Sequence, residues 1–202
     1  MIPLRRRAAT GVSFASILAV AACAAAGASE SPVIPDGKSE TTVYVIRHAE
    51  KASETDTDPN LSARGSERAD SLAVQLRDSG VNMIITSHLR RTQQTAEPLA
   101  RARHIRPTII PIEPSIDAHI NRIVETVKRH QGATILIVGH NNTVGKIVEK
   151  LGGGRIGDLC TDEYSNLIIL SLSKGQPTRL LLEHYGLPDP PAAGDCPHLK
   201  DR

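Results

Sequence analysis

Val43-Tyr44-Val45-Ile46-Arg47-His48-Ala49-Glu50-Lys51 is the stretch that decides the fold, because a short apolar run stops there at charged and imidazole side chains. A run of β-branched and aromatic residues bounded by polar ones predicts a buried strand. In α/β sheets, ligands bind beyond the carboxyl ends of the strands. We therefore expect Arg47 and His48 to lie at a ligand-binding edge of a sheet.

The rest of the chain alternates between strand-like and helix-like segments. Apolar runs predict strands at about 42–46, 81–86, 108–112, 134–138, 166–172 and 178–184. Helical periodicity fills the intervals between the first four strands, with Ser62 and Ser115 as N-caps and Gly80 as a helix end. A short helix to Leu151 follows the fourth strand. This alternation predicts right-handed βαβ units in an α/β fold, a three-layer α/β/α arrangement with a central, mostly parallel sheet.

Residues 1–22 have the layout of a secretory signal peptide, since Arg5, Arg6 and Arg7 precede an uncharged apolar run. That run, of about fifteen residues, is too short for a membrane span. It ends at Val20-Ala21-Ala22-Cys23, which resembles a bacterial lipobox with Cys23 as the lipidated residue. Plain cleavage after Ala26-Gly27-Ala28 is the alternative. We expect an exported protein of the bacterial cell envelope or periplasm, held by a lipid anchor.

The chain beyond the leader divides into three parts. Residues 23–41 predict a flexible tether, 42–186 a globular domain and 187–202 a Pro-rich tail. Because the leader holds three arginines and no acidic residue, its removal takes the formal net charge from +2 to slightly negative. Three tyrosines are then the remaining aromatic residues, too few for a base-stacking platform. Nucleic acid is therefore not an expected partner.

Two cysteines remain once Cys23 is assigned to the anchor. Cys160 and Cys196 form an even pair that could be a disulfide in an oxidising compartment. Spacing alone does not establish that they are close, so two separate thiols are the other interpretation.

Basic and imidazole side chains follow three of the predicted strands: Arg47 and His48 the first, Arg91 the second, and His140 the fourth. At one edge of a parallel sheet, these groups would repel one another unless an anion were bound between them. The arginine fork suits a phosphate, and helix N-termini nearby add backbone donors. The pattern predicts a pocket for a dianion such as phosphate.

A neutral histidine in such a pocket is also a nucleophile toward phosphorus, and this chemistry needs no metal. Nearby arginines would stabilise charge on the transferred group. A metal site built from His48, Glu50 and His140 is conceivable from ligand type, but two neighbouring arginines would oppose a cation.

Four motifs now resemble those of the histidine phosphatase, or phosphoglycerate mutase-like, superfamily. Arg47-His48-Ala49-Glu50 is similar to its Arg-His-Gly-Glu signature, with Ala49 in place of the more common glycine. Leu61–Gly65, Ser87–Ala96 and Gly139-His140 follow in the family's order. The resemblance runs from about Val43 to Tyr185 and indicates a small branch-1-type member, whose fold is a central mixed sheet flanked by helices.

The resemblance implies a role for each matching residue. His48 is expected to be the nucleophile, Arg47 and Arg91 phosphate ligands, and His140 the second histidine of the pocket, with no cofactor and no metal. Arg90 is expected on the helix surface. The implied activity is metal-independent hydrolysis of a phosphomonoester or phosphoprotein through a phosphohistidine.

The proton donor for the leaving group is not fixed by a motif. We expect Glu113, just after the third strand, in that role, and Asp117 as a first-turn charge of the following helix. A phosphomutase is a weaker alternative, because the sequence holds no long lid insertion that would shield a phosphohistidine from water. A catalytically inactive anion-binding lipoprotein of the envelope is the alternative from another class.

Overall fold

The computed structural model describes residues 40–191 and 195–199, so the expected signal peptide and the lipidation site Cys23 lie outside the described residues. The elements in chain order are β1 (Thr41–Arg47), α1 (Ala63–Gln75), β2 (Met83–Thr86), α2 (Arg90–Arg103), β3 (Thr108–Ile109), α3 (Ile116–Arg129), β4 (Thr134–Gly139), α4 (Asn141–Lys150), β5 (Asn166–Leu172) and β6 (Arg179–His184).

The six strands form one mixed sheet in the order β3-β2-β4-β1-β5-β6. Strands β3, β2, β4 and β1 are mutually parallel, whereas β5 pairs antiparallel with β1 and β6 antiparallel with β5. The expected three-layer α/β/α fold with a mostly parallel sheet is confirmed, with the two closing strands supplying its antiparallel part.

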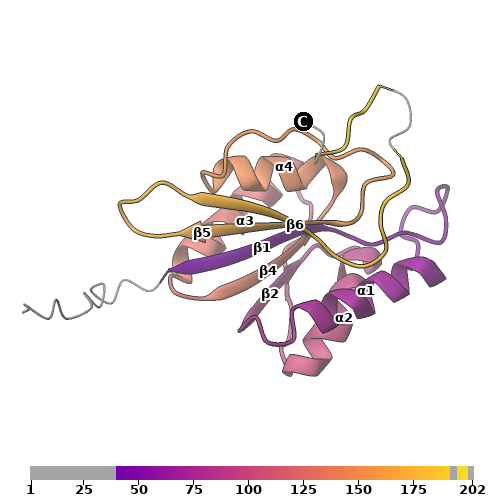
Figure 1. The fold of residues 1–202 in the computed structure, drawn as a ribbon, viewed down its shortest axis with the longest axis horizontal. Helices are drawn as coiled ribbons and strands as arrows, with labels where there is room; N and C mark the ends of the chain where they lie inside the picture. The colour runs from indigo at the N-terminus through magenta and orange to yellow at the C-terminus, as the bar shows by residue number, and fades with distance from the viewer. Residues whose placement is uncertain (1–39, 192–194, 200–202) are drawn as a thin grey trace, which may run out of the picture. The chain divides into compact units, whose positions relative to one another are not determined.

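Helices cover both faces of the sheet, as Figure 1 shows with α3 and α4 on one side and α1 and α2 on the other. Two apolar clusters fill the spaces between the layers. Ile120, Ile123 and Ile147 of α3 and α4 pack against one face, and Leu72 and Leu99 of α1 and α2 pack against the opposite face. The central strands β1, β2 and β4 are largely buried, which explains why their sequences read as continuous apolar runs.

Local signals located the helix starts better than the helix ends. The Ser62 and Ser115 hydroxyls cap α1 and α3, accepting hydrogen bonds from the amides of Gly65 and Ala118. Helix α1 ends at Gln75, whereas Gly80 lies beyond it in a turn with a φ of 79°. The third strand is also shorter than expected, covering Thr108–Ile109.

The described part of the C-terminal tail is bonded to the domain. A disulfide joins Cys160 to Cys196, which confirms the proximity that spacing could not establish. The Asp189 carboxylate accepts hydrogen bonds from the amides of Tyr164 and Ser165. Within the described ranges, no helix has the length and apolar character needed to cross a bilayer.

Candidate active site

The carboxyl ends of β1, β2 and β4 open into one cavity of about 650 Å³. The four residues expected to form the phosphate pocket all line this cavity, namely Arg47, His48, Arg91 and His140. Its other lining residues are Lys51, Glu54, Ile112, Ile116, Asn141, Asn142, Thr143, Thr161, Asp162 and Tyr164. The structure therefore brings together the side chains that the sequence placed at three separate strand ends.

Pairing between β1 and β4 sets the two histidines side by side. Arg47 is opposite Gly139 in the parallel ladder, and the next amide, that of His48, donates to the Gly139 carbonyl at 2.9 Å. The imidazole rings of His48 and His140 consequently lie with their centroids 5.3 Å apart. Strand register alone is sufficient to pair them.

The His48 ring is held in one tautomer. Its Nδ1 lies 2.8 Å from the Ala49 carbonyl oxygen, which can only accept, so Nδ1 carries the proton and Nε2 keeps its lone pair. Burial lowers the His48 pKa to about 3, with Arg47 and Arg91 acting in the same direction and the Ala49 hydrogen bond opposing them. The ring is neutral at physiological pH, and Nε2 is an available nucleophile.

His140 is the second buried imidazole. Its Nε2 shares a 3.1 Å hydrogen bond with the Ser87 hydroxyl, which in turn bonds to Thr92 at the start of α2. Burial first, and then the nearby His48 and Arg91, lower the His140 pKa to about 2. This ring is also neutral, so one of its nitrogens donates and the other accepts, and the ring adds no charge to the cavity.

The Arg47 guanidinium is held by backbone oxygens on one side. Its Nη1 donates to the carbonyls of Cys160, Thr161 and Glu163 at 2.8 to 3.0 Å. The Tyr164 ring covers it at 3.9 Å, within the range of a cation–π contact. The buried Nε of Arg47 has no hydrogen-bond partner among the described residues.

Arg91 enters the cavity from the first turn of α2. Burial lowers its pKa, opposed by Asp58, whose carboxylate lies 3.9 Å from Nη1. Its Nε is buried and also lacks a partner in the described part of the chain. Unpaired buried donors are costly, so two such groups lining one cavity favour an anion as its occupant. Arg90, as expected, is exposed.

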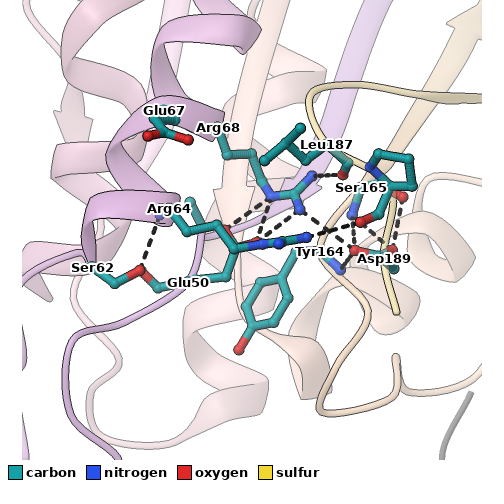
Figure 2. Close-up of polar contacts among 12 residues, drawn as sticks. Glu50, Ser62, Arg64, Glu67, Arg68, Tyr164, Ser165, Leu187 and Asp189 are labelled. Carbon is teal, nitrogen blue, oxygen red and sulfur yellow. Dashed lines mark hydrogen bonds and ion pairs between the residues drawn. The ribbon is translucent and has the colours of Figure 1, made fainter. Parts of the chain in front are cut away.

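Glu50 of the first motif faces away from the cavity, into the ion-pair network drawn in Figure 2. Its carboxylate accepts hydrogen bonds from Arg68 at 2.8 Å and Arg64 at 3.0 Å. Burial acts to raise the Glu50 pKa, but the Arg68 and Arg64 hydrogen bonds hold it below its usual range. Glu50 does not line the cavity with His48 and His140, so these three do not assemble a metal site.

A different group of potential metal ligands lies at the tail. Donor atoms of Cys160, Asp162 and His198 lie within 4.8 Å of one another. Cys160 is bonded to Cys196 in a disulfide, and a disulfide sulfur is not the thiolate that zinc requires. His198 instead contacts the Asp162 carboxylate at 3.1 Å.

Glu113 does not reach the cavity, which corrects its expected place facing His48. Its side chain is exposed and its carbonyl accepts from Arg122, while the preceding Ile112 turns inward to the cavity. Asp117 lies in the first turn of α3, as expected. The titratable side chains without a motif role that do line the cavity are Lys51, Glu54, Asp162 and Tyr164.

Comparison with known proteins agrees with the motifs. Residues 43–113 match the family model described as the histidine phosphatase superfamily (branch 1). The first part of the domain, with the motifs around His48 and Arg91, is therefore similar to this superfamily. "Probable phosphoglycerate mutase GpmB" of Escherichia coli is 36% identical over 66 residues, which is 30% of this chain. That alignment covers 31% of the relative, so the chain spans about a third of the length of the curated relatives it matches.

Solved structures of two phosphatases share the fold. The mycobacterial glucosyl-3-phosphoglycerate phosphatase superposes with a TM-score of 0.57 and 15% identity over 72% of this chain and 98% of its own. The protein histidine phosphatase SixA, solved with tungstate, superposes with a TM-score of 0.56 and 16% identity over 71% and 96% of the two chains. At such identities the likeness supports the fold alone.

Proposed function

We propose that this protein is a metal-independent phosphohydrolase of the histidine phosphatase superfamily, which cleaves a phosphomonoester or phosphoprotein through a phosphohistidine on His48. The observation that carries the proposal is the neutral His48, with Nε2 unprotonated, lining one cavity with two arginines whose Nε donors are buried and unpaired. The cavity combines a nucleophile with donors for a dianion.

The two-step reaction follows from this arrangement. Arg47 and Arg91 bind the phosphoryl oxygens, and the Nε2 lone pair attacks phosphorus as the leaving oxygen departs. Charge on the transferred oxygens is stabilised by the guanidinium groups and by His140 as a neutral donor. Water then attacks the phosphohistidine, which releases inorganic phosphate and restores the neutral imidazole.

A turnover assay with an aryl phosphate tests the activity. We expect the wild-type chain to release phosphate and His48→Ala to lose at least about a thousandfold in kcat, because no other group in the cavity forms the intermediate. Arg90→Ala, an exposed arginine beside Arg91, is the control and should keep wild-type turnover. Equal rates for the wild type and His48→Ala would contradict the proposal.

The alternatives give different results in the same assay. A phosphomutase would transfer phosphate between acceptor hydroxyls more often than to water. An inactive anion-binding protein would bind inorganic phosphate through Arg47 but would hydrolyse no substrate. The polar lining of the cavity, with Lys51, Glu54 and Thr161, supports hydrolysis because such a lining admits water.

Export to the cell envelope, with a lipid anchor on Cys23, is part of the proposal. The Cys160–Cys196 disulfide supports it, since disulfides persist in oxidising compartments. We expect the Cys23→Ser precursor to lose membrane association in cell fractionation. Unchanged membrane association of that variant would exclude the anchor.

A further inference from the structure

Tyr164 is one of the cavity residues that no sequence motif indicated. It lies in the loop between α4 and β5, and its ring contacts one proposed phosphate ligand and lies near the proposed nucleophile. The ring covers the Arg47 guanidinium at 3.9 Å, and its centroid is 6.4 Å from that of His48, at 60° between the planes. The phenol is therefore adjacent to both the nucleophile and a phosphate ligand.

A network of charges fixes the backbone that carries this ring. The amides of Tyr164 and Ser165 donate to the Asp189 carboxylate at 2.9 to 3.1 Å. Asp189 lies 3.7 Å from Arg68, which is bound to Glu50 of the first motif. The loop is thus tied to the strand end that carries His48, so both side chains share one rigid frame.

The Tyr164 hydroxyl takes no part in that network. Figure 2 shows the phenol directed away from Arg68 and Asp189, and its oxygen forms no hydrogen bond with any residue that the structure describes. Burial raises the pKa of this phenol, while Arg47 opposes the shift, so the group is protonated at neutral pH. The hydroxyl is a proton donor bordering the cavity.

The carboxylates of the cavity are less suited to donate a proton. The Glu54 side chain is 76% exposed, and its carboxylate is already bound to Lys51 at 2.6 Å. The Asp162 carboxylate is likewise engaged, by His198 at 3.1 Å. A phenol, unlike a carboxyl group, carries its proton at neutral pH without any upward shift of its pKa, so Tyr164 is the better suited donor.

We propose, on the basis of the phosphohydrolase function above, that Tyr164 is the general acid that protonates the leaving oxygen. In the first step, the His48 Nε2–phosphorus bond forms and the phosphorus–oxygen ester bond breaks. The leaving oxygen takes the Tyr164 proton and departs as an alcohol. Arg47, beneath the ring, stabilises the tyrosinate. In the second step, water attacks phosphorus, its proton returns to Tyr164, and the nitrogen–phosphorus bond breaks.

A pair of aromatic phosphate esters with different leaving groups tests this role. In 4-nitrophenyl phosphate the leaving oxygen departs as a stable anion, whereas in benzyl phosphate it is an alkoxide that requires a proton. We expect Tyr164→Phe to lower kcat for benzyl phosphate by about a hundredfold or more and for 4-nitrophenyl phosphate by only a few fold. The phenylalanine keeps the ring over Arg47.

Two further variants complete the experiment. Tyr44→Phe, which removes a hydroxyl from β1 away from the cavity, should leave both rates at wild-type values. If Tyr164→Phe lowers both rates equally, or lowers neither, the proposal is overturned. It is also overturned if the wild-type chain hydrolyses 4-nitrophenyl phosphate but not benzyl phosphate. If Asp162→Asn, and not Tyr164→Phe, lowers kcat for benzyl phosphate far more than for 4-nitrophenyl phosphate, the general acid is Asp162 and the proposal is wrong. Wild-type inactivity toward both substrates would contradict the phosphohydrolase function itself.

Discussion

Two neutral histidines define the candidate site at the scale of single residues. His48 and His140 are 3% and 5% exposed, and burial beside two arginines keeps both uncharged. The same burial that keeps His48 neutral, as the proposed nucleophile must be, also makes the fold sensitive to acid. In the unfolded chain these histidines regain a pKa of about 6.5 and take up protons that the folded chain excludes.

Stability should therefore fall as the pH drops below about 6.5. Because the folded pKa values are depressed, the unfolded state binds more protons, and each histidine should cost about 2 kcal/mol between pH 7 and pH 5. Urea denaturation at the two pH values measures the difference. The His48→Gln/His140→Gln variant should lose most of that difference. An unchanged pH dependence in this variant would contradict the assignment of neutral histidines.

Arg68 is predicted to affect the free energy of unfolding, because it neutralises the largely buried carboxylate of Glu50. Arg68 and Arg64 both bind Glu50, but their side chains are 1% and 49% exposed. We expect Arg68→Ala to lower the free energy of unfolding by about 3–5 kcal/mol, because it leaves the Glu50 carboxylate buried without its main partner. Arg64→Ala should cost no more than about 1 kcal/mol. Similar losses in both variants, measured by denaturation, would contradict this distinction.

At the scale of elements, strand ends and helix starts carry the site. The sequence predicted the apolar strands and the Ser62 and Ser115 caps because those signals are local. It also predicted that β1, β2 and β4 would present their polar ends together. It did not predict the Tyr164 loop, because that depends on β5 running antiparallel beside β1, which no local pattern specifies.

The close approach of α1 to the first motif gives a prediction at this scale. A Cβ at Gly65 would lie 2.1 Å from the Glu50 carbonyl oxygen, so the helix could not keep its position. We expect Gly65→Ala to lower the melting temperature, although alanine is the better helix former. Ser66→Ala, at an exposed position of the same helix, should change it little. A Gly65→Ala chain as stable as the wild type would contradict the packing described.

At the scale of the whole molecule, the C-terminal tail completes the site from a distance. Residues 187–202 read as a Pro-rich tail, yet Asp189 and Cys196 hold the loop that supports Arg47 and Tyr164. Composition could not show this, because the bonds join segments far apart in sequence. Glu113 illustrates the converse, since its position in the chain suggested proximity to His48 and its side chain is exposed.

Removal of the disulfide should affect both stability and the site. The Cys160→Ser/Cys196→Ser chain loses a cross-link spanning 36 residues, and we expect about 2–4 kcal/mol less stability. The carbonyls of Cys160, Thr161 and Glu163 bind Arg47, so phosphate affinity should weaken as well. Denaturation and phosphate titration measure the two effects. Unchanged stability and affinity would show that the tail does not support the loop.

The most direct test of the central claim is to trap the phosphoenzyme. Rapid denaturation of the chain during turnover of a labelled aryl phosphate, followed by peptide mass spectrometry, should place one base-stable, acid-labile phosphoryl group on His48. The label should be absent from His48→Ala. Turnover without any phosphoenzyme, or a phosphoryl group on another residue, would contradict the account.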